Sequence, residues 1–126
     1  MIVPQQGNLR VVTEMGILNV DVGEIVVVPR GILFQINCVD ETTYDSSNFG
    51  YILEVDEHFC LPNLGVIGSN GLANARDFLS PVAWFDEENA GLEHESKIFT
   101  IYNKFGGKLF KRFSNHTPYD VVAWVS

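Results

Sequence analysis

Short apolar runs separated by turn-forming residues predict a protein built almost entirely from β-strands. The runs are rich in β-branched and aromatic side chains, and glycine or proline often stands between them. One stretch, residues 17–22, largely alternates apolar with polar side chains, as a strand with one buried face does. The expected strands are residues 9–13, 16–20, 25–28, 32–39, 51–55, 99–103, 109–113 and 121–125.

Polar loops and one short helix are expected between the strands. Residues 40–48 and 86–96 are polar and acidic, which predicts solvated loops. Residues 74–79 form the only plausible helix, of one or two turns, capped by Asn74 and ended before Pro81. No internal repeat or linker divides the chain. The pattern therefore predicts a single all-β domain, an antiparallel sandwich or barrel.

The charge balance argues against a nucleic-acid partner. Sixteen acidic and eight basic residues give a net charge of −8, whereas phosphate binding requires clustered lysine and arginine. A local cluster of bases does occur late in the chain. We interpret it as the solvated face of two strands, with an anion site as the alternative. The cluster consists of Lys97, Lys104, Lys108, Lys111 and Arg112.

A cytoplasmic location without a membrane partner is expected. No apolar run approaches the ~20 residues that span a bilayer, and no basic leader precedes the domain. Without a secretion signal, Cys38 and Cys60 are interpreted as two reduced thiols rather than a disulfide.

One irregular stretch is unusually apolar. Residues 61–79 read LPNLGVIGSNGLANARDFL, with three glycines and a proline among the first eleven residues. A flexible linker would be polar, so this stretch is expected to be a long, packed connection. Such loops are uncommon in compact domains and tend to be specific to a family.

The irregular stretch resembles homogentisate 1,2-dioxygenases, as do residues 3–7, 104–110 and 121–124. The resemblance extends over nearly the whole chain. It implies that residues 1–126 form one cupin-like antiparallel β-sandwich or jelly roll, partial, with one short helix. It also places the chain in the amino-terminal, non-catalytic region of the family. The intact family enzyme uses Fe(II) and O2 to open the ring of homogentisate, which gives maleylacetoacetate in tyrosine and phenylalanine catabolism.

The second metal-binding motif of cupins can be aligned with residues 23–38. Gly23, Pro29 and Gly31 stand at the required spacing, but Phe34 takes the place of the ligand histidine and Cys38 that of the asparagine. A phenyl ring has no lone pair for a metal, so Phe34 is expected to be buried and structural. We therefore expect no catalytic, cofactor-binding or metal-binding residue in this chain.

The first cupin motif is only partly represented. It ends in a glycine that matches Gly7, and its glutamate would fall before Met1. The resemblance places the family's iron ligands, two histidines and a glutamate, in a later region. After residue 124 the family continues with His-Gly-Asn-Tyr, whereas this chain has Val125 and Ser126. An excised domain, a truncated paralogue and a natural small protein all remain open.

Neither the histidines nor the aromatic residues suggest a site of their own. His58 is interpreted as a polar residue at a strand end and His116 as part of a turn. His94 is interpreted as part of an acidic loop, with a divalent-cation site as the alternative. Most aromatic residues are interpreted as barrel core rather than as a ligand cage. They are Phe34, Phe49, Tyr51, Phe78, Trp84, Phe99, Phe105, Phe110 and Trp124.

Two functions remain open from the sequence. The first is a non-catalytic scaffold or oligomerisation region of a homogentisate 1,2-dioxygenase-like protein, which would pack against the carboxy-terminal catalytic region. The second is a stand-alone, metal-free cupin-like binding or assembly module. A homo-oligomer is expected in both cases, because a sheet without the strand of the first motif would have an open edge.

Overall fold

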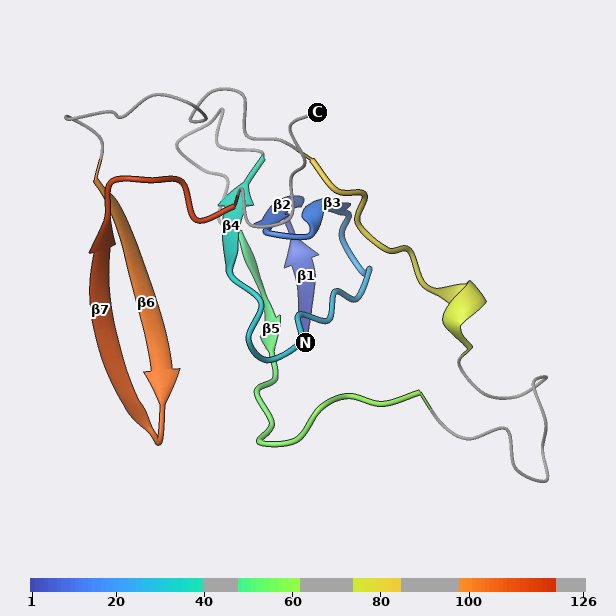
Figure 1. Cartoon of the computed structure of the whole chain (residues 1–126). Coiled ribbons are helices and arrows are strands. Elements are labelled where there is room, and N and C mark those ends of the chain that lie inside the picture. Colours follow the sequence, from blue (N-terminus) through green and yellow to red (C-terminus); the bar gives the residue numbers. More distant parts are fainter. Residues whose placement is uncertain (40–47, 62–73, 85–97, 120–126) are drawn as a thin grey trace.

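The computed structural model describes residues 1–39, 48–61, 74–84 and 98–119 (Figure 1). These residues form antiparallel strands and a single turn of 3₁₀ helix. This confirms the all-β prediction and is consistent with a cupin-like fold. The elements are β1 (Ile2–Gln6), β2 (Leu9–Thr13), β3 (Gly16–Val20), β4 (Phe34–Cys38), β5 (Phe49–Ile52), η2 (Ala75–Asp77), β6 (Phe99–Phe105) and β7 (Lys108–Ser114).

The central sheet has the strand order β3-β2-β4. Val11 is fully buried in the middle of β2 and lies opposite Leu18 on one neighbour and Ile36 on the other. β-Branched residues suit such a position, because they pack well on a pleated surface. The bounds predicted for the first two strands are confirmed. The expected strand 32–39 is shorter in the structure, where only Phe34–Cys38 pairs with β2.

The second sheet joins the amino terminus to a distant segment. β1 pairs with β5, and the register of the two strands shifts between Pro4 and Gln6. The chain near Val26 approaches the same strand, because Ile2 and Val26 exchange two backbone hydrogen bonds of 2.8 and 3.0 Å. The expected strand 25–28 is therefore wrong, since it amounts to one isolated bridge.

The buried side chains in the described structure are mainly aliphatic. Ile2, Leu9, Val11, Val20 and Val26 form one cluster, in which β1, β2 and β3 meet the chain that precedes β4. The aromatic core expected from the sequence is wrong for most of the described aromatic residues. About half or more of the side chain is exposed in Phe34, Phe49, Tyr51, Phe78, Phe105 and Phe110, while Trp84 and Phe99 are partly buried.

The aromatic side chains remain exposed because of where their strands lie. β4 is at the edge of its sheet, and β5, β6 and β7 belong to two-stranded sheets. Among the described residues, strands of different sheets make few contacts with one another, so little packs over these side chains.

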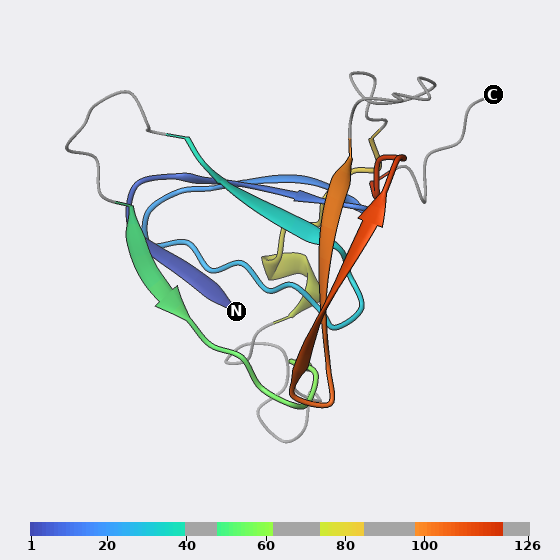
Figure 2. The same cartoon turned by 90° about the vertical axis from the view of Figure 1, so that its left-hand side faces the viewer.

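The last two strands form a long hairpin that stands beside the rest of the described chain (Figures 1 and 2). Gly106 and Gly107 join them with φ angles of +55° and +74°. Two consecutive positive φ angles suit a tight hairpin turn, which glycine adopts without strain. Both strands are longer than the predicted ranges 99–103 and 109–113. Ile101 is the one residue of the hairpin that is buried.

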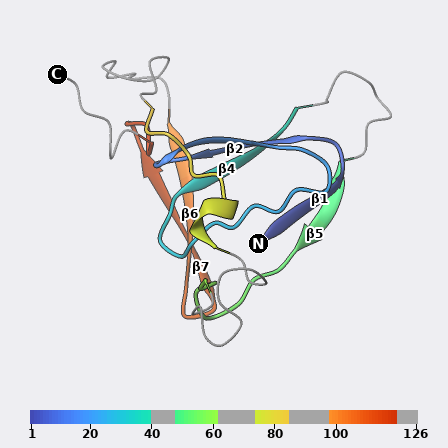
Figure 3. The same cartoon turned by 90° about the vertical axis from the view of Figure 1, so that its right-hand side faces the viewer.

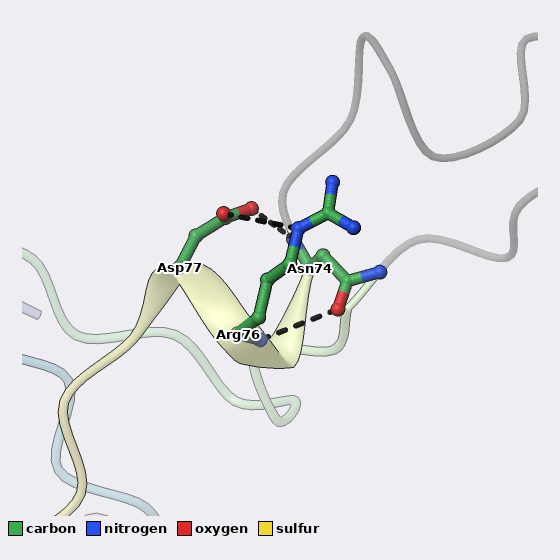
Figure 4. A network of polar contacts seen from close by, with 3 residues as sticks. All are labelled: Asn74, Arg76 and Asp77. Carbon is green, nitrogen blue, oxygen red and sulfur yellow. Dashed lines mark hydrogen bonds and ion pairs between the residues drawn. The ribbon is translucent and has the colours of Figure 1, made fainter.

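The predicted helix at residues 74–79 is confirmed as a single turn. The Asn74 side chain accepts a hydrogen bond of 3.2 Å from the backbone N–H of Arg76, and the Asp77 carboxylate accepts one of 2.8 Å from the backbone N–H of Asn74 (Figure 4). This reciprocal pair satisfies backbone donors that a helix start leaves unpaired. No described helix is long and apolar enough to cross a membrane.

The segment after this turn is fixed against the central sheet (Figure 3). The indole N–H of Trp84 donates a hydrogen bond of 3.0 Å to the backbone carbonyl of Thr13. Gly16 has a φ of +138°, and a Cβ atom there would lie 2.8 Å from the Pro81 side chain and overlap the Val82 carbonyl. The turn between β2 and β3 therefore requires glycine for both conformation and space.

Several sequence predictions lie outside the described residues. They concern the acidic loops, most of the irregular stretch and the strand at 121–125, together with His94, Lys97 and Trp124.

Replacing Val11 by alanine should lower the free energy of unfolding by about 2 kcal/mol, because the change empties a fully buried position. Urea denaturation measures the difference. Val22→Ala is the matched control, because Val22 is 51% exposed and its truncation should change stability by less than about 0.5 kcal/mol. Equal effects of the two changes would contradict the assigned core.

Gly16→Ala should cost more stability than Gly23→Ala, although both glycines have positive φ. A Cβ at Gly23 meets nothing within 4 Å, so only backbone strain of about 1–2 kcal/mol is expected. At Gly16 the overlap with Val82 adds a packing cost of about 1–3 kcal/mol. Thermal unfolding monitored by tryptophan fluorescence would measure both, and a tolerated Gly16→Ala would show that this contact is absent.

Candidate functional site

The cupin-type motif borders a cleft with a volume of about 810 Å³. The cleft lies between the start of β4, the segment that follows β5, and β6. Its volume is in the range of small-molecule sites, roughly 300–1,000 Å³. The charged and aromatic side chains that line the cleft include Arg30, Phe34, Glu54, His58, Tyr102 and Lys104.

The glycines and the proline of the motif turn the chain toward β4. Gly23 and Gly31 have φ angles of +87° and +89°, which favour glycine. Beyond this turn, the backbone N–H of Leu33 donates to the Glu14 carboxylate at 3.1 Å, and the Leu33 carbonyl accepts from the backbone N–H of Glu14 at 3.3 Å. These contacts place Phe34 at the first position of β4, opposite Thr13.

Phe34 is not buried, so this prediction is wrong. Its side chain is 48% exposed and borders the cleft. The physical reason is that the described structure has no second layer packed across this end of β4, so one side of the ring faces the open cleft. Cys38, at the asparagine position of the motif, is partly buried and packs against the core cluster.

Charged groups connect opposite sides of the cleft. The Lys104 ammonium on β6 forms an ion pair with the Glu54 carboxylate at 2.6 Å, and Arg30 donates to the Asp56 carbonyl. The two side chains of the Lys104–Glu54 pair are 52% and 65% exposed. A pair so exposed to water contributes only about 0–1 kcal/mol, so it positions β6 without fixing it rigidly.

The described histidines are not part of a metal-binding group. His58 is exposed in the segment after β5, as expected for a polar residue at a strand end. The backbone N–H of His116 donates to the Ser114 hydroxyl, whose own proton is donated to the His116 carbonyl, as in the predicted turn. Among the described residues, no three histidine, cysteine or carboxylate side chains come close enough to hold a metal ion.

The bases of the hairpin form a solvated surface, as the sequence predicts for the described members of the cluster. Lys104, Lys108, Lys111 and Arg112 are all exposed. The Lys111 ammonium lies 4.8 Å from the ring centre of Phe113 and 5.9 Å from that of Tyr102. These distances permit cation–π attraction, worth about 0.5–1 kcal/mol at exposed sites.

Comparison with known proteins identifies the family of this chain. Residues 1–126 match the family described as homogentisate 1,2-dioxygenase N-terminal. The chain belongs to this family. It is 52% identical to homogentisate 1,2-dioxygenase of Drosophila melanogaster, 51% to that of Dictyostelium discoideum and 46% to that of Homo sapiens. Each alignment covers 98% of this chain and 26% of the relative, so the chain spans about a quarter of the length of these relatives.

The described residues do not fit the iron that the dioxygenase family implies. Phe34 at the histidine position of the motif offers no ligand, and the described part of the chain gathers no ligand set elsewhere. No chemical step through iron can therefore be assigned to these residues.

Sequence reasoning missed the long-range contacts of the described structure. Lys104 and Glu54, which meet at the cleft, are 50 positions apart, and Trp84 and Thr13, which meet at the central sheet, are 71 positions apart. No local pattern signals an interaction over such separations.

Phe34→Ala should lower the free energy of unfolding by about 1–2 kcal/mol, roughly half the loss expected for a fully buried phenylalanine, because the ring is half exposed. Leu79→Ala, at a residue 91% exposed, is the control with no expected loss. Phe34→His should not create an iron site, because partner ligands are missing. A loss above about 3 kcal/mol for Phe34→Ala in urea denaturation would show that Phe34 is buried, as the sequence predicts.

Proposed function

We propose that this chain acts as the non-catalytic amino-terminal region of a homogentisate 1,2-dioxygenase-like protein. The observation that supports this best is the match over residues 1–126 to the N-terminal family, together with the quarter-length coverage of the relatives. In this role the chain, as one cupin-like domain, scaffolds an oligomer and packs against the carboxy-terminal catalytic region.

The chemistry of the proposed whole protein is oxidative ring cleavage. Homogentisate and O2 give maleylacetoacetate, in the catabolism of tyrosine and phenylalanine, and Fe(II) supplies the oxygen chemistry. We assign the iron to the region beyond this chain, because the described residues offer no ligand set. The contribution of this chain is then structural.

Exposed apolar side chains support a packing role. Ile52 is 76% exposed, Phe105 79% and Leu79 91%. Burial of such side chains against another protein surface would remove apolar area from water, which favours association. Such contacts fit both the catalytic region and other copies of the chain.

The cytoplasm is the proposed location of this protein. Cys38 and Cys60 are both free in the structure, and free thiols persist in a reducing compartment.

A stand-alone cupin-like binding or assembly module is the second candidate. The cleft favours it, because a cavity of this volume beside Phe34 and Tyr102 could hold a small apolar molecule without a metal. Gene context separates the two candidates. A downstream reading frame with the two histidines and the glutamate supports the enzyme, and its absence supports the module.

The purified chain alone should bind iron at far less than one equivalent and show no homogentisate-dependent O2 consumption, since its described residues gather no ligand set. Metal analysis and an oxygen electrode measure the two quantities. The full-length Drosophila melanogaster relative serves as the positive control. Stoichiometric iron with O2 uptake by this chain would contradict the assignment of a non-catalytic region.

A further inference from the structure

A small apolar pocket lies between the sheet of β1 and β5 and the sheet of β2, β3 and β4. It has a volume of about 150 Å³ and is bordered by residues of β1, β2, β4 and β5. Only Ile2 and Ile52 border both this pocket and the cleft, so the two are separate places in the fold. Among the described residues, no charged side chain lines the pocket. Such a lining suits a neutral molecule, because an ion would lose its hydration there without a partner of opposite charge.

Part of the pocket is lined by residues of the core. Ile2 and Leu9 are buried members of the core cluster, and Ile36 and Cys38 pack against that cluster. Phe49, which is 59% exposed, borders the pocket from β5. Apolar cavities of this volume hold single benzene-sized rings. The pocket therefore suits one small ring in contact with aliphatic side chains and Phe49.

Asn48 gives the pocket an unpaired hydrogen-bond acceptor. It lines the pocket, and its side-chain oxygen Oδ1 is buried and has no hydrogen-bond partner within the described structure. The amide lies against Gly7, where an added Cβ atom would overlap with Oδ1. A buried acceptor without a donor is costly, so a ligand that donates a hydrogen bond to it is favoured over one of the same shape that does not.

We propose that this pocket binds a small neutral ring compound with one hydroxyl group, of which phenol is the simplest aromatic example. The ring contacts Ile2, Ile36 and Phe49, and the hydroxyl donates its hydrogen bond to Asn48 Oδ1. Carboxylates and protonated amines are excluded by the uncharged lining. This site is additional to the structural role of the proposed function and does not depend on it.

The two cysteines allow the proposal to be tested within one chain. Cys38 lines the pocket and is partly buried, whereas Cys60 is exposed and does not line it. A ring bound in the pocket should slow the reaction of Cys38 with a thiol reagent and leave the reaction of Cys60 unchanged. Mass spectrometry of the labelled peptides measures the two rates separately.

Phenol and fluorobenzene are matched probes, because they are similar in shape and only phenol donates a hydrogen bond. For an expected Kd of ~1 mM, about 5 mM phenol should slow the labelling of Cys38 roughly sixfold. The hydrogen bond is expected to contribute up to about tenfold in affinity. Fluorobenzene at the same concentration should therefore slow the labelling only about 1.5-fold.

Asn48→Leu tests the acceptor, because it removes the amide and keeps a side chain of similar size. Phenol and fluorobenzene should protect Cys38 equally in this variant. Asn37→Leu is the matched control, since Asn37 lies between Ile36 and Cys38 on the opposite side of β4 and does not line the pocket. It should keep the preference for phenol. Circular dichroism checks that both variants fold, and if Asn48→Leu does not, the two probes on the unmodified chain test the proposal alone.

Three results would overturn the inference. Labelling of Cys38 that phenol does not slow would exclude binding in the pocket. Equal slowing of Cys38 and Cys60 would show a general effect of phenol on the chain instead of a site. Equal protection by the two probes in the unmodified chain, or a preference for phenol that persists in Asn48→Leu, would exclude the hydrogen bond to Asn48. None of these results bears on the structural role, which the iron and O2 measurements test separately.

Discussion

Burial of β2 between β3 and β4 is the constraint on which the other described elements depend. Val11 at the centre of β2 is fully buried, and each of its neighbouring strands pairs with all five residues of β2. Leu9, at one end, joins the cluster that holds Ile2 and Val26. Thr13, at the other end, accepts the Trp84 hydrogen bond. The amino terminus, the cupin-type motif and the segment after η2 are thus all positioned by this one strand.

The exposed aromatic residues of the strands lie on β4, β5 and the hairpin of β6 and β7. Within the hairpin only Ile101 is buried. A hairpin alone is at best marginally stable in water, so its persistence depends on contacts with neighbouring surfaces. The chain spans about a quarter of the length of these relatives, and under the proposed function the rest of such a protein covers part of this surface.

The sequence predicts local features of this fold well. The bounds of β2 and β3 follow from alternation and turn residues, and the capped turn at Asn74 follows from side-chain chemistry that acts over three residues. β1 was not expected, because Pro4 interrupts its run and its pairing with β5 is visible only in three dimensions. The strand expected at 25–28 is wrong because local composition was misleading. Its residues are β-branched, but only Val26 pairs with another strand.

The cupin-type motif keeps its backbone conformation although its ligand histidine is replaced. Gly23 and Gly31 keep positive φ angles and Leu33 pairs with Glu14, although a phenylalanine replaces the ligand histidine. The turn is formed by the two glycines and by hydrogen bonds between Leu33 and Glu14, 19 positions apart in the sequence, and none of these contacts involves the side chain at position 34. Burial of Phe34 required more than that turn, namely a second layer across β4, and a sixteen-residue motif carries no information about such a layer. The burial that the motif predicted for Phe34 is therefore wrong.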